Sequence, residues 1–385
     1  MTAAPPRRDE EDVGAAAKNA APAILTIDLD AIAANYRRLS ALAAPAECAA
    51  VVKADAYGLG MRKVAPALWR AGCNTFFVAT LAEAEALRGL LPEATIYVFG
   101  GLFAGTAPRF GEFDVRPVLN SLAEIREWAA FSAGSGRKLP AAIHIDSGMN
   151  RLGLSAAEVE ATAQDSELWS AIELTLVMSH LACADTPEHS KSDAQRRVFD
   201  TLRAHLPRAL ASLANSAGIL LGRPFHYDLV RPGIALYGGS ARSGRDSEFT
   251  PVLRLDARIA QLRDVAAGET VGYGATRTLK RPSRVATIAI GYADGLFRTL
   301  SAGDGEEGLA VYLGPHPAPI LGRVSMDLIS VDVTGVPEHL ARRGGWVELI
   351  GPHISLQTLA ARAGTIDYEI LTNLGARAVR HYRGG

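Results

Sequence analysis

Cysteine is scarce in this sequence, with only three among 385 residues. Cys48, Cys73 and Cys183 stand far apart, so neither a disulfide framework nor the spacing of a zinc site is expected, and a reducing compartment is favoured. Long apolar runs are missing too, since none reaches the roughly 18 residues that a membrane-spanning helix needs. We therefore predict a cytoplasmic protein with no metal site and no membrane segment.

An excess of charge of either sign is also absent. The formal net charge is −1, which gives no reason to expect nucleic acid or an anionic membrane surface as a partner. Hydrophobic residues make up 48% and charged residues 21% of the chain, as in soluble globular enzymes. A chain of this length usually divides into two domains. Residues 1–22 mix alanine, proline and charge without an apolar signal segment, so we predict a disordered tail there.

Short β-rich runs recur at intervals of roughly 20 to 35 residues in the first two thirds of the chain. The predicted strands are residues 48–53, 75–79, 94–98, 115–119, 141–146, 174–178, 209–214 and 227–230. Helical patterns lie between several of them, the clearest at residues 81–91 and 190–206. Eight strands alternating with helices predict an α/β fold, a (β/α)8 TIM barrel over residues 23–244.

The sequence changes character after about residue 245. Residues 239–249 are polar and rich in glycine and serine, which is typical of a linker. Strand-like runs with few helices between them follow at residues 252–262, 284–290, 309–313, 328–333 and 346–350, and short helices are predicted at 354–363 and 367–374. This pattern predicts a mainly β C-terminal domain over residues 245–385.

Lys53 stands at the end of an apolar strand, in the segment AAVVKADAYGLG. Burying an ammonium group costs desolvation free energy, so a lysine at this position needs a physical reason. One interpretation is a lysine whose amine reaches solvent at the barrel rim. The other is a desolvated amine with a lowered pKa, ready for covalent chemistry with a carbonyl compound.

Polar residues after other predicted strands favour the second interpretation. They are Arg151, His180, Asn215, Ser216 and Arg231. The carboxyl ends of barrel strands meet on one face, and that face carries the active site in (β/α)8 enzymes. The small residues after Ser216 and at 232–234 leave backbone N–H groups free to hold a phosphate.

Eight segments carry a resemblance to a known family. They are VVKADAYG, DSGMNRLG, SHLACAD, LANSAG, VRPGIALYG, VGYGATRT, IGYADG and GRVSMD. From about Ile24 to the C-terminus the sequence resembles the alanine racemases, in which these segments occur in the same order. The resemblance implies a pyridoxal-phosphate-dependent isomerase that interconverts L-alanine and D-alanine with two bases, a lysine and a tyrosine. It also implies a homodimer with shared active sites that supplies D-alanine for peptidoglycan synthesis.

Matched position by position, the resemblance implies that Lys53 carries the cofactor and acts as one base. Arg151 would reach the ring phenolate oxygen and the substrate, His180 would lie against the ring, and Arg231 would face the pyridine nitrogen. The remaining cofactor contacts implied are Tyr57, Asn215, Ser216 and the backbone at Gly233 and Ile234. An arginine at the pyridine nitrogen only donates hydrogen bonds, so it disfavours ring protonation and the transamination that protonation promotes.

The resemblance assigns three further residues to the partner subunit. Tyr273 would be the second base, while Tyr292 and Met326 would lie on the substrate side and at the entrance. Two of them have a structural alternative: a turn or packing tyrosine at 273 and core packing by Met326. Likewise, His180 could be a core histidine, and Arg231 could pair with Asp228 or Asp146.

Three positions depart from the family pattern. His144 stands where the family often has a carboxylated lysine, so a carbamate cannot form there and Arg151 needs another partner, neutral or a bound anion such as chloride. Ser212 replaces a frequent histidine, so Arg231 must be supported differently. The C-terminal segment LTNLGARAVRHY has no clear match for a phosphate-binding tyrosine, because Tyr382 lies too far along.

Two other classes of protein are alternatives. A pyridoxal-phosphate-dependent decarboxylase of related fold would usually place a carboxylate at the pyridine nitrogen, which Arg231 argues against. A non-catalytic pyridoxal-phosphate-binding protein would be a barrel alone, which the C-terminal domain with Tyr273 argues against.

Overall fold

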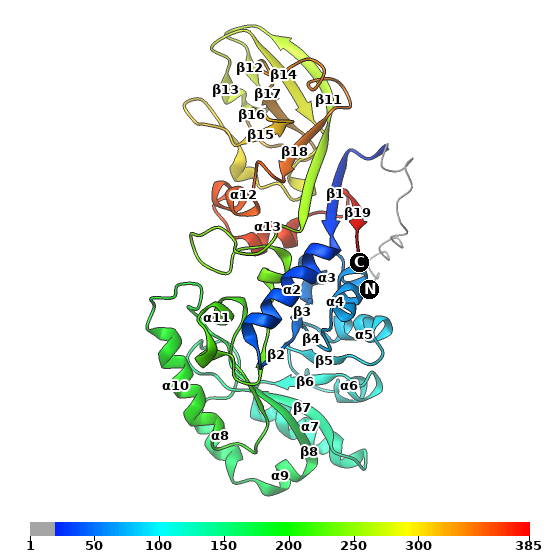
Figure 1. Ribbon diagram of the computed structural model, residues 1–385, viewed down its shortest axis with the longest axis vertical. Helices are drawn as coiled ribbons and strands as arrows, with labels where there is room; N and C mark the ends of the chain where they lie inside the picture. Colours follow the sequence, from blue (N-terminus) through cyan, green and yellow to red (C-terminus); the bar gives the residue numbers. More distant parts are fainter. Residues whose placement is uncertain (1–19) are drawn as a thin grey trace. The chain divides into compact units, whose positions relative to one another are not determined.

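The computed structural model describes residues 20–385, which form two compact units (Figure 1). One unit is Asp30–Thr250, and the other combines residues 20–29 with Pro251–Gly385. The predicted tail lies outside the described residues as far as residue 19. The prediction counted residues 23–29 with the barrel, and this is corrected: β1 (Ala23–Asp28) pairs with β11 (Leu253–Val265) and β19 (Val379–Arg383) of the second unit.

The first unit is built on parallel strands. Seven of them are hydrogen-bonded in chain order, namely β3 (Ala50–Val51), β4 (Thr75–Val78), β5 (Thr95–Val98), β6 (Arg116–Leu119), β7 (Leu139–His144), β8 (Ile172–Met178) and β9 (Leu210–Ser212). The eighth, β10 (Leu229–Val230), pairs with β2 (Glu47–Cys48) directly before β3. It also joins β9, because the Arg231 N–H donates to the Ala214 carbonyl. The strands therefore close into the predicted TIM barrel.

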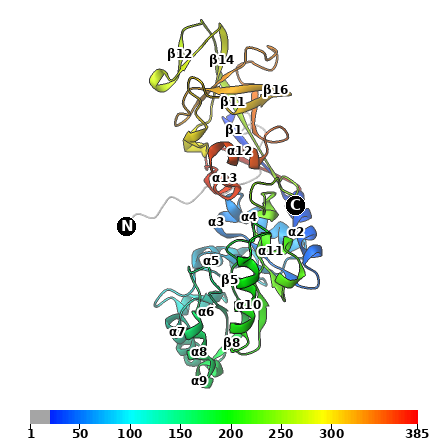
Figure 2. The same ribbon diagram turned by 90° about the vertical axis from the view of Figure 1, so that its left-hand side faces the viewer.

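Helices surround this barrel in both views (Figures 1 and 2). They are α2 (Leu29–Ala43), α4 (Met61–Arg70), α5 (Leu81–Leu90), α6 (Ala107–Glu112), α7 (Leu122–Gly134), α8 (Ala156–Ala163), α9 (Ser166–Ala171), α10 (Lys191–Arg203) and α11 (Ser216–Leu220). The α5 helix begins where predicted, since Thr80 and Glu83 form a reciprocal capping box there. Every residue of β4 is buried, as expected for a strand covered on both faces.

The second unit is mainly antiparallel. Six strands form a closed ring in which β11 pairs with both β14 and β18: β11, β14 (Ser283–Ile288), β17 (Ile329–Asp332), β16 (His316–Leu321), β15 (Ala310–Leu313) and β18 (Trp346–Ile350). The helices α12 (Leu356–Ala363) and α13 (Asp367–Asn373) follow. The mainly β prediction is confirmed, but it missed β16, whose Pro317 and Pro319 argue against a strand in local sequence.

Candidate active site

The predicted rim residues do lie at the carboxyl ends of the barrel strands. Lys53 follows β3, Arg151 lies in the segment after β7, and His180 follows β8. Ser216 begins α11 after β9, and Arg231 directly follows β10. Burial lowers the pKa of His180 well below its ordinary value, and the neighbouring basic groups Arg231, Arg151, His144 and Lys53 lower it further. The structure therefore gathers five basic groups on one face.

Lys53 opens an unusual segment, α3 (Lys53–Tyr57). Residues 54–57 all have φ between 53° and 56°, so a left-handed turn forms without any glycine. Such a conformation costs roughly 1–2 kcal/mol per residue. Glu83 offsets part of this cost, because its carboxylate accepts the Ala54 N–H at 2.6 Å. The turn carries Lys53 and Tyr57 at its two ends.

The Lys53 amine is half-buried, with its Nζ 5.8 Å from the centre of the Phe99 ring. Burial lowers the pKa of Lys53, and the Arg151 charge lowers it further, while Glu83 opposes the shift. A lysine whose neutral form is favoured is the better nucleophile and base. The environment therefore agrees with a chemical role rather than with a solvated rim lysine.

Arg231 is almost completely buried, with 2% of its surface exposed. Its Nη1 donates to the Ser212 hydroxyl, and its Nη2 donates to the Ser179 carbonyl at 2.6 Å and, more weakly, to the Leu213 carbonyl at 3.4 Å. Its Nε has no hydrogen-bond partner among the described residues. Burial lowers the pKa of Arg231 to about 9, so the guanidinium stays charged at neutral pH.

No carboxylate compensates Arg231 within residues 20–385, and the proposed structural pairings are wrong. Asp228 instead accepts the Ala211 N–H. Asp146 accepts backbone N–H groups from Gly148, Met149 and Asn150. A buried cation with an unused donor is costly without a ligand that accepts from it. The residues therefore fit an acceptor such as the ring nitrogen of pyridoxal phosphate.

His144 is buried and neutral. Its Nδ1 lies 2.8 Å from Asn120 Oδ1. The Asn120 amide nitrogen donates to the Val118 carbonyl at 2.8 Å, so the amide oxygen faces His144 and Nδ1 carries the hydrogen. Burial, helped by the charge of Arg231, lowers the pKa of His144 to about 4. Arg151 has no hydrogen-bond or ion-pair partner in the described part of the chain, so its partner stays a prediction.

A small polar cradle lies at the start of α11. The Ser216 hydroxyl accepts from the backbone N–H groups of Gly233 at 2.9 Å and Ala235 at 3.3 Å. Gly233 has no room for a side chain, because a Cβ there would lie 2.2 Å from Tyr57 Oη. Tyr57, Ser216 and the backbone at Gly233 and Ala235 thus lie close together, and donors gathered in this way suit a phosphate, whereas a phosphate contact of Ile234 stays a prediction. Asn215 caps α11 by accepting the Gly218 N–H at 2.9 Å.

The second unit holds the other three predicted residues. Tyr273 stands in the turn η3 (Tyr273–Ala275) with 73% of its surface exposed. Tyr292 begins η4 (Tyr292–Asp294), whose backbone is joined to the segment of Met326, since the Ala293 N–H donates to the Met326 carbonyl at 3.0 Å. Met326 is 53% exposed, so it is not core packing.

Several residues that organise these sites were missed from the sequence. Asn120 and Ser179 directly follow predicted strands, so the rule that found Lys53 could have found them. Gln195 had no such signal; from α10 it donates to the His180 carbonyl at 2.9 Å. Arg377 had none either; it binds Asp294 at 2.7 Å and Asp327 at 2.7 Å, and so ties together the segments of Tyr292 and Met326.

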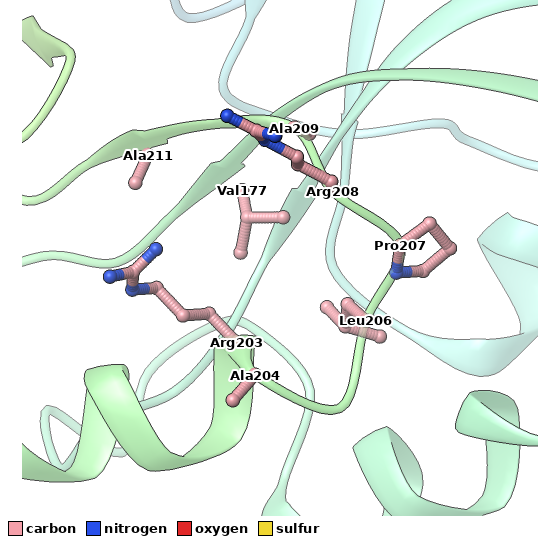
Figure 3. Close-up of a pocket in the computed structure, with 8 residues that line it drawn as sticks. All are labelled: Val177, Arg203, Ala204, Leu206, Pro207, Arg208, Ala209 and Ala211. Atoms are coloured by element: carbon pink, nitrogen blue, oxygen red, sulfur yellow. The ribbon is translucent and has the colours of Figure 1, made fainter.

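A separate pocket of about 240 Å³ contains none of these residues (Figure 3). It is lined by Val177, Arg203, Ala204, Leu206, Pro207, Arg208, Ala209 and Ala211. Arg203 already pairs with Asp200 at 3.2 Å, so we do not assign this pocket to the chemistry. Within residues 20–385 no group of three or more His, Cys, Asp or Glu side chains could hold a metal ion, and no helix could span a membrane.

Known proteins match the chain along almost its whole length. The alanine racemase N-terminal domain matches residues 27–241, and the alanine racemase C-terminal domain matches residues 252–382. The alanine racemase of Methylobacterium nodulans is 52% identical over 94% of this chain and 96% of its own. The catabolic alanine racemase of Mesorhizobium japonicum is 50% identical over 95% of this chain and 94% of its own.

Solved structures agree with these matches. The alanine racemase of Bartonella henselae, determined with covalently bound pyridoxal phosphate, has a TM-score of 0.89 and 43% identity over 94% of this chain and 100% of its own. The biosynthetic alanine racemase of Pseudomonas aeruginosa has a TM-score of 0.87 and 36% identity over 94% of this chain and 100% of its own.

Proposed function

The chain belongs to the alanine racemase family, and we propose that Lys53 and Tyr273 are the two bases of this enzyme. As an isomerase of this family, it interconverts L-alanine and D-alanine with pyridoxal phosphate. The observation that best supports a racemase over a decarboxylase is the environment of Arg231. The guanidinium is buried, its acceptors are neutral, and its Nε is unpartnered in the described structure. A decarboxylase of related fold would usually place a carboxylate at the pyridine nitrogen instead.

Lys53 would hold pyridoxal phosphate, and this cofactor would supply an electron sink that makes the Cα proton of alanine removable. The amino group of alanine would displace the Lys53 amine from the cofactor, which would free that amine to act as a base. The lowered pKa of Lys53 lets its amine take up and return a proton on one face of the substrate. Arg231 offers the ring nitrogen a hydrogen bond from a charged donor, which opposes protonation there. Arg151 and the other cations of the rim suit the negative charges of the cofactor and of the substrate carboxylate.

The second face needs a second base, and we assign it to the partner subunit's Tyr273. The exposure of Tyr273, Tyr292 and Met326 in the single chain supports this proposal, because exposed side chains are available for contact with another subunit. A homodimer with two shared sites follows, in which each barrel faces the partner's second unit. We further propose that the enzyme works in the cytoplasm and supplies D-alanine for peptidoglycan.

Two measurements on the purified protein test the function. A visible absorption band that hydroxylamine removes is expected for the lysine-bound cofactor. Chiral chromatography should then show D-alanine formed from L-alanine, and the reverse reaction, with other amino acids assayed alongside. Cofactor binding without formation of D-alanine would leave a binding protein, and release of carbon dioxide from an amino acid would indicate the decarboxylase.

A further inference from the structure

Ser212, the last residue of β9, occupies a position of unusual constraint next to Arg231. Its side chain is fully buried. A hydroxyl has only one hydrogen, and Ser212 donates it to the Leu229 carbonyl at 2.5 Å. The lone pairs of Oγ therefore remain for the Arg231 Nη1, which donates to them. The direction of this hydrogen bond is fixed by the neighbouring backbone.

The guanidinium of Arg231 is planar, so two anchors on different nitrogens determine how it is turned. One anchor is the Ser179 carbonyl, which accepts from Nη2 at 2.6 Å. The weaker Leu213 contact at 3.4 Å is on the same nitrogen and adds little constraint. Ser212 supplies the only strong second anchor within the described chain. Without it the plane could turn about Nη2, and Nε would change direction.

We infer that Ser212 is a positioning residue for racemisation, which keeps Arg231 Nε free of protein acceptors so that it can donate to the cofactor's ring nitrogen. This inference rests on the proposed function. Its physical basis is that Nε is a buried donor without a protein partner, whereas Nη1 and Nη2 are both engaged. A buried donor left without an acceptor is unfavourable, so the arrangement makes sense when a ligand accepts from Nε.

A neutral anchor has a chemical consequence for the reaction. The serine hydroxyl holds Arg231 without adding charge, and Ser179 contributes only a carbonyl. The positive charge of Arg231 therefore acts undiminished on the ring nitrogen, which opposes its protonation. If Arg231 turns away, protonation becomes easier, and the amino group of alanine is more often left on the cofactor. That side reaction consumes one water and releases one pyruvate for each pyridoxamine phosphate formed.

The test compares three variants of the holoenzyme. Ser212→Ala removes the anchor, and Ser212→Thr restores a hydroxyl at the same place. Ser132→Ala is the matched control, because Ser132 is also fully buried and donates to the Ala171 carbonyl at 2.6 Å, but it belongs to α7 and touches no rim residue. Cofactor content, the visible spectrum of the resting enzyme, racemisation and pyridoxamine phosphate are measured for each.

We expect Ser212→Ala to raise pyridoxamine phosphate formed per racemisation by about tenfold, the effect typical of one hydrogen bond to a charged group. Its resting spectrum should also change, while Ser132→Ala should lower stability only, and Ser212→Thr should behave more like wild type. The inference would be overturned if Ser212→Ala and Ser132→Ala formed the same amount of pyridoxamine phosphate per racemisation and both had unchanged spectra. If wild type makes no D-alanine, the proposed function fails instead, and the spectra still report on Ser212.

Discussion

Lys53 and Arg231 show how burial in a barrel lowers the pKa of basic side chains. Neither is neutralised by a carboxylate in direct contact within the described structure, and burial is the first cause of both lowered pKa values. The cost of keeping such groups away from water has to be met by other contacts. A negatively charged cofactor would offset this desolvation cost for the whole basic cluster. Each of these side chains can therefore be tested by substitution.

Lys53 should be the residue that pyridoxal phosphate modifies. Borohydride reduction of the holoenzyme, followed by peptide mapping, is expected to place the pyridoxyl group on Lys53. Lys53→Ala should lose the label, because within residues 20–385 Lys53 is the lysine among the basic groups that act on His180. Lys63→Ala is the control, since Lys63 is exposed on α4. A label that persists in Lys53→Ala would contradict the assignment.

His144 should make stability depend on pH. Its pKa is about 4 in the folded protein and about 6.5 when unfolded, so protons bind preferentially to the unfolded chain. Stability is therefore complete above about pH 6.5 and is lost as the pH falls toward 4. Between pH 7.5 and 4.5 the imidazole should account for roughly 2–3 kcal/mol of lost unfolding free energy.

His144→Gln provides the comparison, because an amide does not titrate in this range. Equilibrium unfolding of both proteins in urea, at several pH values, should give a smaller loss for the variant. The difference between the two profiles isolates His144 from His180 and the carboxylates, which titrate in both proteins. Parallel profiles would mean that the imidazole is not held neutral.

Two short segments create the small polar cradle. The left-handed turn at residues 54–57 places Lys53 and Tyr57 on one site, and the Gly233 segment runs past the Tyr57 hydroxyl. The turn is not an isolated preference of its residues, because alanine and tyrosine disfavour positive φ. The strain is maintained by surrounding contacts such as Glu83, and strained backbone held in this way is frequent at functional sites.

Gly233→Ala should disturb this cradle. Its φ is −126°, so backbone strain is not the reason; the new Cβ would lie 2.2 Å from Tyr57 Oη and 2.9 Å from its Cζ. Displacement of a well-packed ring typically costs about 1–3 kcal/mol. We expect weaker pyridoxal phosphate binding in an absorbance titration and a lower Tm.

Gly89→Ala is the matched control for that experiment. Gly89 lies in α5, and a Cβ there would meet no atom within 4 Å. Alanine in a helix interior is expected to be neutral or slightly stabilising. If both variants bind the cofactor like wild type, Gly233 is not part of the cradle.

The proposed shared active sites would be a property of the assembly. Lys53 belongs to the first unit and Tyr273 to the second, and the proposed homodimer brings one subunit's Lys53 together with the partner subunit's Tyr273. Lys53→Ala and Tyr273→Phe should each be nearly inactive as homodimers. In a mixture, every heterodimer keeps one intact site, because the symmetric interface is used twice.

Equal mixing after verified subunit exchange should therefore return roughly a quarter of wild-type activity, since half of the dimers are heterodimers with one of two sites intact. Sedimentation should show a dimer throughout. No recovered activity despite exchange would mean that both residues act within one chain. Recovery without any dimer would refute the assembly itself.

Local sequence was enough to predict the strands of the barrel and the face on which the candidate site residues lie. Periodicity and strand ends depend on neighbouring residues, so the predicted run at 75–79 became β4 and the polar residues after such runs reached one rim. The chemical family followed from ordered motifs. The same local signals also marked Asn120 and Ser179, although they were not used.

Long-range contacts decided the rest. β1 joins the second unit because β11 and β19, more than 200 residues away, complete its hydrogen bonds. Ser212 gained its role from Arg231 and Leu229, and His144 its neutral tautomer from Asn120. The left-handed turn likewise depends on Glu83. Propensity describes a residue among its neighbours, whereas hydrogen-bond direction, burial and pKa depend on atoms that only the folded chain brings near.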